Sequence, residues 1–143
     1  MRLNLNPYLF FNGNCEEALQ TYERVLGGKI ENLVKHKDSP DKNVPAGWGD
    51  KVLHGRFTIG DNVLMVSDAP PQHAQNPQGF FVNINVPDSA TGERIFNALA
   101  QGGSVKQAYG KTFWTEGFGM LVDRFGIPWM INVEHAARLE KTA

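Results

Sequence analysis

The stretch FWTEGFGMLVDRFGIPWMIN, residues 113–132, is the part of the chain in which aromatic residues, glycines and a proline are most concentrated. Its second half alternates strongly apolar residues with others, and successive side chains of a β-strand point to opposite faces of the sheet. One face of this strand carries Ile127, Trp129, Ile131 and Val133. We expect that face to pack in the core against a helix, with Trp129 as its largest member.

The other face of the same strand has a different character, because it carries Pro128, Met130, Asn132 and Glu134. A thioether is flexible and apolar, and a side-chain amide both donates and accepts hydrogen bonds. Met130 and Asn132 therefore have the properties of residues that line a ligand site. Trp114 can stack on a planar or apolar ligand, although packing is the simpler role for a tryptophan. The stretch thus predicts core on one face and a binding wall on the other.

The chain contains the same order of predicted elements twice. In the first half, these are a strand at 8–11, a helix from Asn14 to Gly27-Gly28, and strands near 30–34, 53–59 and 63–66. In the second half, they are a strand at 79–86, a helix from Pro87-Asp88-Ser89 to Gly102-Gly103, and strands from Val105, at 120–122 and at 127–133. We predict a single α+β domain over 1–143, with one βαβββ module at 5–68 and a second at 79–135. Asn14 is the predicted cap of the first helix.

Composition and charge exclude several classes of protein. The 14 basic and 15 acidic side chains nearly balance, and no run of Lys or Arg suggests a surface for nucleic acid. No stretch is long and apolar enough to span a membrane, and the N-terminal residues do not resemble a signal peptide. The single cysteine, Cys15, excludes an intramolecular disulfide and is typical of a reducing cytoplasm. We therefore expect a cytoplasmic protein that binds neither nucleic acid nor membrane.

Three stretches carry a resemblance to a known family: NGNCEEALQTYERVLGG at 12–28, LHGRFTIGDNVLMVSDA at 53–69, and the run at 113–132. Together they resemble the PhnB-like branch of the glyoxalase/bleomycin-resistance superfamily, also called vicinal oxygen chelate proteins. The resemblance covers most of the chain apart from 38–50 and the tail. It implies the glyoxalase/bleomycin-resistance/dioxygenase fold, in which two βαβββ modules form a cupped mixed sheet around a ligand cavity. It also implies a homodimer, which open sheet edges favour.

Enzymes of this superfamily hold a divalent metal with His, Gln or Glu side chains on four strands. The resemblance places the four positions at about Pro7, Met65, Phe80 and Met130. None of these residues suits a hard or borderline divalent ion. The nearest substitutes, Asn6, Ser67, Asn83 and Asn132, are amides and a hydroxyl, which are weak as a set. We therefore expect no standard metal site and no cofactor.

His54 is the remaining candidate for chemistry. Its strand places it with Arg56 and Thr58 on the polar face, either as a surface residue or as a general base or ligand-orienting donor in a cavity. A triad of His54 with Ser67 and Asp68 is conceivable, but no G-x-S-x-G elbow is present. Members of this branch are sometimes labelled as ubiquinone-pathway methyltransferases, yet the chain has no G-x-G-x-x-G loop for a nucleotide-containing cofactor.

Two functions are compatible with these observations. The first is a small-molecule-binding protein with a partly apolar cavity, for which the candidate ligand-binding residues are Met65, Ser67, Trp114, Met130 and Asn132, with His54 as the candidate catalytic residue. The alternative is a metal-dependent lyase or isomerase of the vicinal oxygen chelate type. The absence of a standard metal set favours the first.

Overall fold

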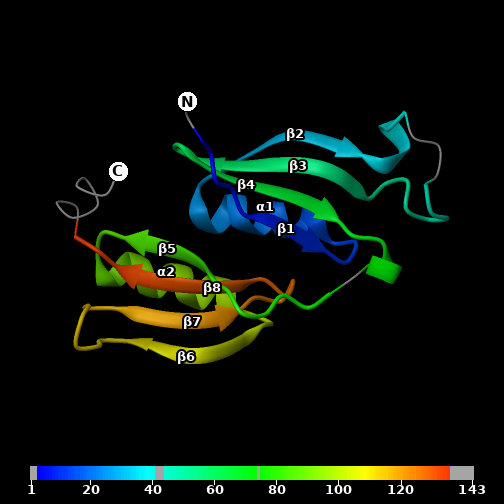
Figure 1. Ribbon diagram of the computed structural model, residues 1–143. Coiled ribbons are helices and arrows are strands. Elements are labelled where there is room, and N and C mark those ends of the chain that lie inside the picture. Colours follow the sequence, from blue (N-terminus) through cyan, green and yellow to red (C-terminus); the bar gives the residue numbers. More distant parts are fainter. Residues whose placement is uncertain (1–2, 41–43, 74, 136–143) are drawn as a thin grey trace. The chain divides into compact units, whose positions relative to one another are not determined.

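The computed structural model describes residues 3–40, 44–73 and 75–135. They belong to two compact units, Met1–Gln75 (unit 1) and Asn76–Ala143 (unit 2), each built around one helix and four strands (Figure 1). Unit 1 contains β1 (Tyr8–Phe11), α1 (Cys15–Leu26), β2 (Lys29–Lys35), β3 (Val52–Ile59) and β4 (Asn62–Asp68), with short 3-10 helices at His36–Asp38 and Pro71–His73. Unit 2 contains β5 (Val82–Val86), α2 (Ser89–Ala100), β6 (Ser104–Gly110), β7 (Phe118–Val122) and β8 (Pro128–Val133).

The two units share one topology. The strand order is β1-β4-β3-β2 in unit 1 and β5-β8-β7-β6 in unit 2, and the first strand of each unit pairs in parallel with the last. The other neighbours are antiparallel. The strands thus form two four-stranded mixed sheets, which confirms the predicted α+β fold with two βαβββ modules. Their organisation as a single domain stays a prediction.

Each helix packs on one face of the sheet in its own unit (Figure 1). In unit 1, the buried Tyr22 of α1 lies against the rings of Phe11 and Phe57, with centroids 6.4 and 6.3 Å away. Apolar residues of a helix at three- and four-residue steps share one face, and this face of α1 is buried. Among the described residues of unit 1, no helix lies on the opposite face of the sheet, and we call it the unit 1 face.

In unit 2, the core lies between α2 and the sheet. Trp129 is 1% exposed, and Ile127, Ile131 and Val133 are also buried, which confirms the predicted core face of the closing strand. Gly119 lets α2 approach the sheet, because a β-carbon built there would lie 2.6 Å from Cε2 of Phe96. The strand residues between these core positions point to the helix-free side, which we call the unit 2 face.

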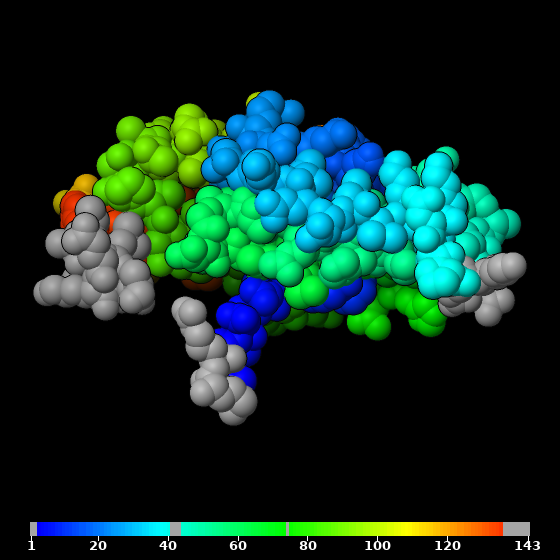
Figure 2. All heavy atoms as spheres, turned by 90° about the horizontal axis from the view of Figure 1, so that it is seen from above, coloured from blue at the N-terminus to red at the C-terminus, as the bar shows by residue number. Residues whose placement is uncertain are grey.

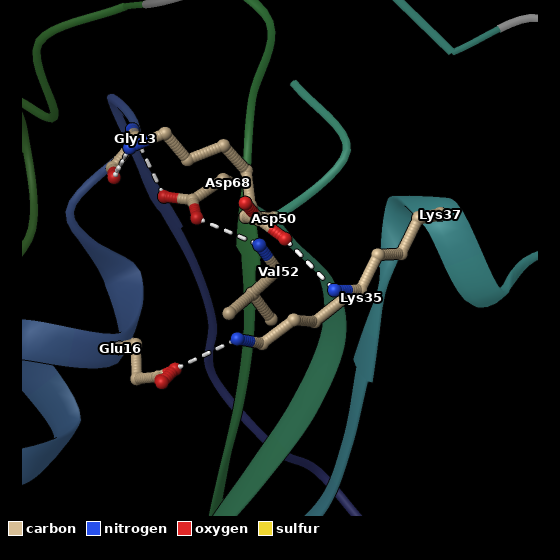
Figure 3. Close-up of polar contacts among 8 residues, drawn as sticks. Gly13, Glu16, Lys35, Lys37, Asp50, Val52 and Asp68 are labelled. Atoms are coloured by element: carbon tan, nitrogen blue, oxygen red, sulfur yellow. Dashed lines mark hydrogen bonds and ion pairs between the residues drawn. The ribbon is translucent and has the colours of Figure 1, made fainter. Parts of the chain in front are cut away.

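A buried aspartate organises each unit. The Asp68 carboxylate accepts hydrogen bonds from the main-chain N–H groups of Gly13 and Val52, each at 2.9 Å (Figure 3). It also accepts from the main-chain N–H of Cys15 at 2.9 Å. In unit 2, Asp123 accepts from the main-chain N–H groups of two turn residues and from Nε1 of Trp129 at 2.8 Å. Buried carboxylates of this kind hold turns whose N–H groups have no other partner.

The structure corrects two local predictions. Asn14 stands at the N-cap of α1, but its side chain makes no capping hydrogen bond, and the first N–H group of the helix, that of Cys15, donates to Asp68 instead. The strand predicted at 79–86 begins only at Val82, where pairing with Trp129 starts. Gly79 has φ of 87°, a left-handed conformation that belongs to a turn rather than to a strand.

Charged side chains protect the open edge of unit 1. β2 is an end strand of its sheet, and the light blue and cyan atoms of this strand and the segment after it lie at the surface in Figure 2. Lys35 pairs with Glu16 at 3.5 Å, and Lys37 pairs with Asp50 at 2.9 Å (Figure 3). Charges on an edge strand oppose its pairing with another chain. None of the helices in the described part of the chain is long and apolar enough to cross a membrane.

Candidate functional site

Strand register gathers polar and aromatic side chains on the unit 1 face. Tyr8 is opposite Met65 on the neighbouring strand, and Phe10 is opposite Ser67. Arg56 is opposite Met65 on the other neighbouring strand, β3. His54 lies two residues before Arg56 in β3, so its side chain points to the same face. The predicted residues His54, Met65 and Ser67 therefore share one face.

Tyr8 connects these residues. Its ring stacks on Phe10 with centroids 5.0 Å apart, and its hydroxyl lies 3.1 Å from Nδ1 of His54. Partial burial raises the pKa of Tyr8 above its ordinary value, and the Cys15 side chain raises it further. The phenol therefore stays protonated at neutral pH. When it donates to Nδ1, the proton of the neutral His54 imidazole lies on Nε2. Tyr8 and Phe10 were not among the residues predicted from the sequence, although their two-residue spacing in a strand indicates a shared face.

The conceivable Ser–His–Asp triad is not assembled. Both carboxylate oxygens of Asp68 are occupied by main-chain N–H groups, and the Ser67 hydroxyl donates to the Asp68 main-chain carbonyl at 3.4 Å. His54 has the Tyr8 hydroxyl as its partner at Nδ1. A nucleophilic serine needs a base oriented by a third group, and Asp68 serves the fold instead.

Cys15 is fully buried at the start of α1. Burial raises the pKa of the Cys15 thiol well above its ordinary value, and the negative charges of Asp68 and Glu16 raise it further. Because the thiolate is the nucleophilic form, a protonated and inaccessible thiol has a packing role.

The unit 2 face brings together amides and thioethers. Asn83 is opposite Met130, Asn85 is opposite Asn132, and Met120 is opposite Met130 from the other side. The Oδ1 atom of Asn85 accepts hydrogen bonds from Nδ2 of Asn83 at 3.0 Å and from Nδ2 of Asn132 at 3.4 Å. The Oδ1 atom of Asn132 is shielded from solvent and has no hydrogen-bond partner.

Aromatic rings lie beside this amide cluster. Phe118 is opposite Asn132 across β7 and β8, and its ring meets that of Trp114 edge-on at 5.3 Å. Trp114 is 51% exposed, and Phe113 next to it is 97% exposed. The predicted residues Trp114, Met130 and Asn132 thus belong to one surface. Asn85 and Phe118 were not predicted from the sequence. Strand register, not order in the chain, decides which residues lie beside them.

The four positions that the resemblance predicts for metal ligands carry unsuitable donors here. Pro7 precedes β1, Met65 lies in β4 opposite Tyr8, and Met130 lies in β8 opposite Asn83. Phe80, the predicted fifth-strand position, precedes β5 and is exposed. Thioethers, a neutral phenol and an amide do not fit a divalent ion, which prefers imidazole and carboxylate ligands. Over 3–40, 44–73 and 75–135, no three His, Cys, Asp or Glu side chains are grouped so that they could hold a metal.

Similar proteins extend these observations. Protein YjdN from Escherichia coli (strain K12) is 35% identical over 138 residues, which cover 90% of this chain and 94% of YjdN. The crystal structure of protein PA1353 from Pseudomonas aeruginosa is 46% identical with a TM-score of 0.86, and the match covers 94% of this chain and 99% of that one.

At lower identity, the likeness concerns the fold. A structure described as a putative 3-demethylubiquinone-9 3-methyltransferase, PhnB protein, from Bacillus cereus is 23% identical with a TM-score of 0.76, covering 92% of this chain and 100% of that one. Members of the wider glyoxalase/bleomycin-resistance superfamily share the fold as well. The family model described as 3-demethylubiquinone-9 3-methyltransferase matches residues 4–132. The chain therefore belongs to that family, the PhnB-like branch of the glyoxalase/bleomycin-resistance superfamily.

Proposed function

We propose that this protein binds a small, partly apolar molecule through the unit 2 face, without a standard metal site, and that it does so in the cytoplasm. The observation that carries the proposal is the amide cluster of Asn83, Asn85 and Asn132 beside the ring pair of Trp114 and Phe118. Small-molecule sites typically combine apolar and aromatic surface with a few polar groups that fix orientation.

The energetics of these side chains support a binding role. An exposed tryptophan and two half-buried methionines provide apolar surface that a ligand can cover. A polar atom shielded from water without a partner costs roughly 1–3 kcal/mol, and a ligand that supplies the partner recovers part of that cost. Asn132 is such a residue. The methyltransferase activity in the family's description is not part of the proposal, because the chain lacks a glycine-rich nucleotide loop.

The test is an NMR titration of the isotope-labelled full chain with two-ring aromatic probes, indole and quinoline. We expect signals of Met130, Asn132 and the Trp114 indole to shift on binding. Asn132→Leu should weaken the binding of indole, which carries an N–H donor, about two- to tenfold, the loss of one hydrogen bond. Asn97→Leu, at an exposed position on α2, is the matched control and should leave the affinity unchanged. Probes that shift no signal of the unit 2 face would refute the proposal.

The second candidate is a lyase or isomerase that uses His54 without a metal. The hydrogen bond between the Tyr8 hydroxyl and Nδ1 of His54 favours it, because in the tautomer whose Nδ1–H donates to the Tyr8 oxygen, Nε2 is oriented and free to accept a proton. If the wild type converts a bound compound and both His54→Ala and Tyr8→Phe abolish that conversion, the result favours this candidate over simple binding. Binding without conversion in the wild type would favour the first.

We also propose that the protein is a homodimer, as the family resemblance implies. Exposed apolar side chains support this: Leu3, Leu5 and Phe10 in unit 1, and Phe113 in unit 2, are each more than half exposed. Sedimentation at micromolar protein concentration is expected to give a species of twice the 15.9 kDa chain mass. A single species with the mass of one chain would contradict the proposal.

A further inference from the structure

On β5, β7 and β8 the unit 2 face carries no ionisable side chain. By register and alternation, its residues there are Asn83, Asn85, Phe118, Met120, Val122, Pro128, Met130 and Asn132. Lys106 lies on the end strand β6, and Glu134 follows the end of β8. A charged ligand group that left water here would meet no opposite charge, and burial of an unpaired charge is unfavourable. This surface therefore favours a neutral ligand.

One acceptor atom of the amide cluster, Oδ1 of Asn132, lacks a hydrogen-bond donor. Asn85 Oδ1 is the shared acceptor for Asn83 and Asn132, so both donor groups point toward it and the Asn132 oxygen points away. That oxygen has no partner. The side chain as a whole is only half-buried, and the last torsion of an asparagine is soft, so a small rotation can present the oxygen to a ligand.

Rings stand next to this acceptor. Phe118 is the direct cross-strand neighbour of Asn132, and such neighbours have β-carbons about 5 Å apart. Trp114 extends the aromatic surface from Phe118 toward solvent. A flat ring system that packs here places its edge close to the Asn132 oxygen.

We infer that the unit 2 face selects neutral, planar ring compounds that carry an N–H donor at the ring edge, such as lactams and related heteroaromatic amides. This inference rests on the proposed function and names the class of its ligand. The donor pairs with Oδ1 of Asn132, and the ring packs on Trp114, whose own ring contacts the buried Phe118. The interaction is specific to the donor, because an N-methylated ring of the same shape leaves the oxygen unpaired.

Four probes of similar size test it on the full chain: 2-quinolone, N-methyl-2-quinolone, quinoline and quinoline-2-carboxylate. In NMR titrations we expect 2-quinolone to bind about three- to tenfold more tightly than the N-methyl compound or quinoline. The anionic carboxylate should bind most weakly. In Asn132→Leu the preference for 2-quinolone should fall to near one, whereas Asn97→Leu should retain it.

The outcomes separate this inference from the proposed function. Equal affinities for the three neutral probes, with shifts confined to the unit 2 face, would overturn the donor preference and leave binding by this face intact. Tighter binding of quinoline or of the carboxylate would overturn the inference in the same way, since both present acceptors. Failure of every probe to shift signals of this face would overturn both.

Discussion

Replacement of Trp129 by alanine is expected to lower the free energy of unfolding by about 3–5 kcal/mol, the usual cost of truncating a buried aromatic. The side chain is 1% exposed and lies on the face of β8 that α2 covers, opposite Val82 and Leu121. The truncation leaves a cavity that rigid strands on both sides do not fill. It also removes the Nε1 donor to Asp123 at 2.8 Å. Urea unfolding followed by far-UV circular dichroism measures the loss.

Two further variants separate the effect of the lost ring volume from the effects of the lost hydrogen bond and of truncating an exposed tryptophan. Trp129→Phe keeps most of the ring volume and loses the hydrogen bond, so we expect a smaller loss of about 1–3 kcal/mol. Trp114→Ala, at a tryptophan that is 51% exposed, should cost less than about 1 kcal/mol. Equal unfolding midpoints for Trp129→Ala and the wild type would mean that the assignment of core and binding faces is reversed.

Asp68→Ala is expected to destabilise the protein by at least about 3 kcal/mol. Its carboxylate is 2% exposed and accepts from the main chain at Gly13, Cys15 and Val52. Two of these groups belong to the connection between β1 and α1 and the third to the start of β3, so one side chain joins two segments that are distant in sequence. A buried donor that loses its partner costs roughly 1–3 kcal/mol.

The effect of Asp68 can be distinguished from a general effect of removing a negative charge. Asp50→Ala removes a carboxylate that is 80% exposed and pairs with Lys37 at the surface, and such pairs contribute little. The loss of unfolding free energy in Asp68→Asn should lie between those of Asp68→Ala and Asp50→Ala. One oxygen remains to accept hydrogen bonds, but the amide NH₂ group faces a main-chain donor. If Asp68→Ala unfolded at the same urea concentration as Asp50→Ala, the three hydrogen bonds would not be essential to unit 1.

The sequence by itself determined the elements and the core of this protein. Alternation in 127–133 identified the buried face of β8, and the paired glycines after each helix located the ends of α1 and α2 to within two residues. Such patterns are local: a period of two or 3.6 residues follows from the backbone geometry of one segment. For the same reason, the duplicated order of elements and the family resemblance could be read before any coordinates.

Tertiary structure alone decided which side chains meet. The partner of Tyr8 is His54, 46 positions away, and the partners of Asp68 lie 16 to 55 positions away. Asn85 joins Asn132 only because β5 and β8 pair in parallel with that register. A strand register that slips by one residue turns every side chain to the other face, and the pairing energy that selects it is spread over many long-range contacts. No single segment encodes that choice, so the amide cluster, the unpaired Asn132 oxygen and the role of Asp68 in place of Asn14 emerged only from the folded chain.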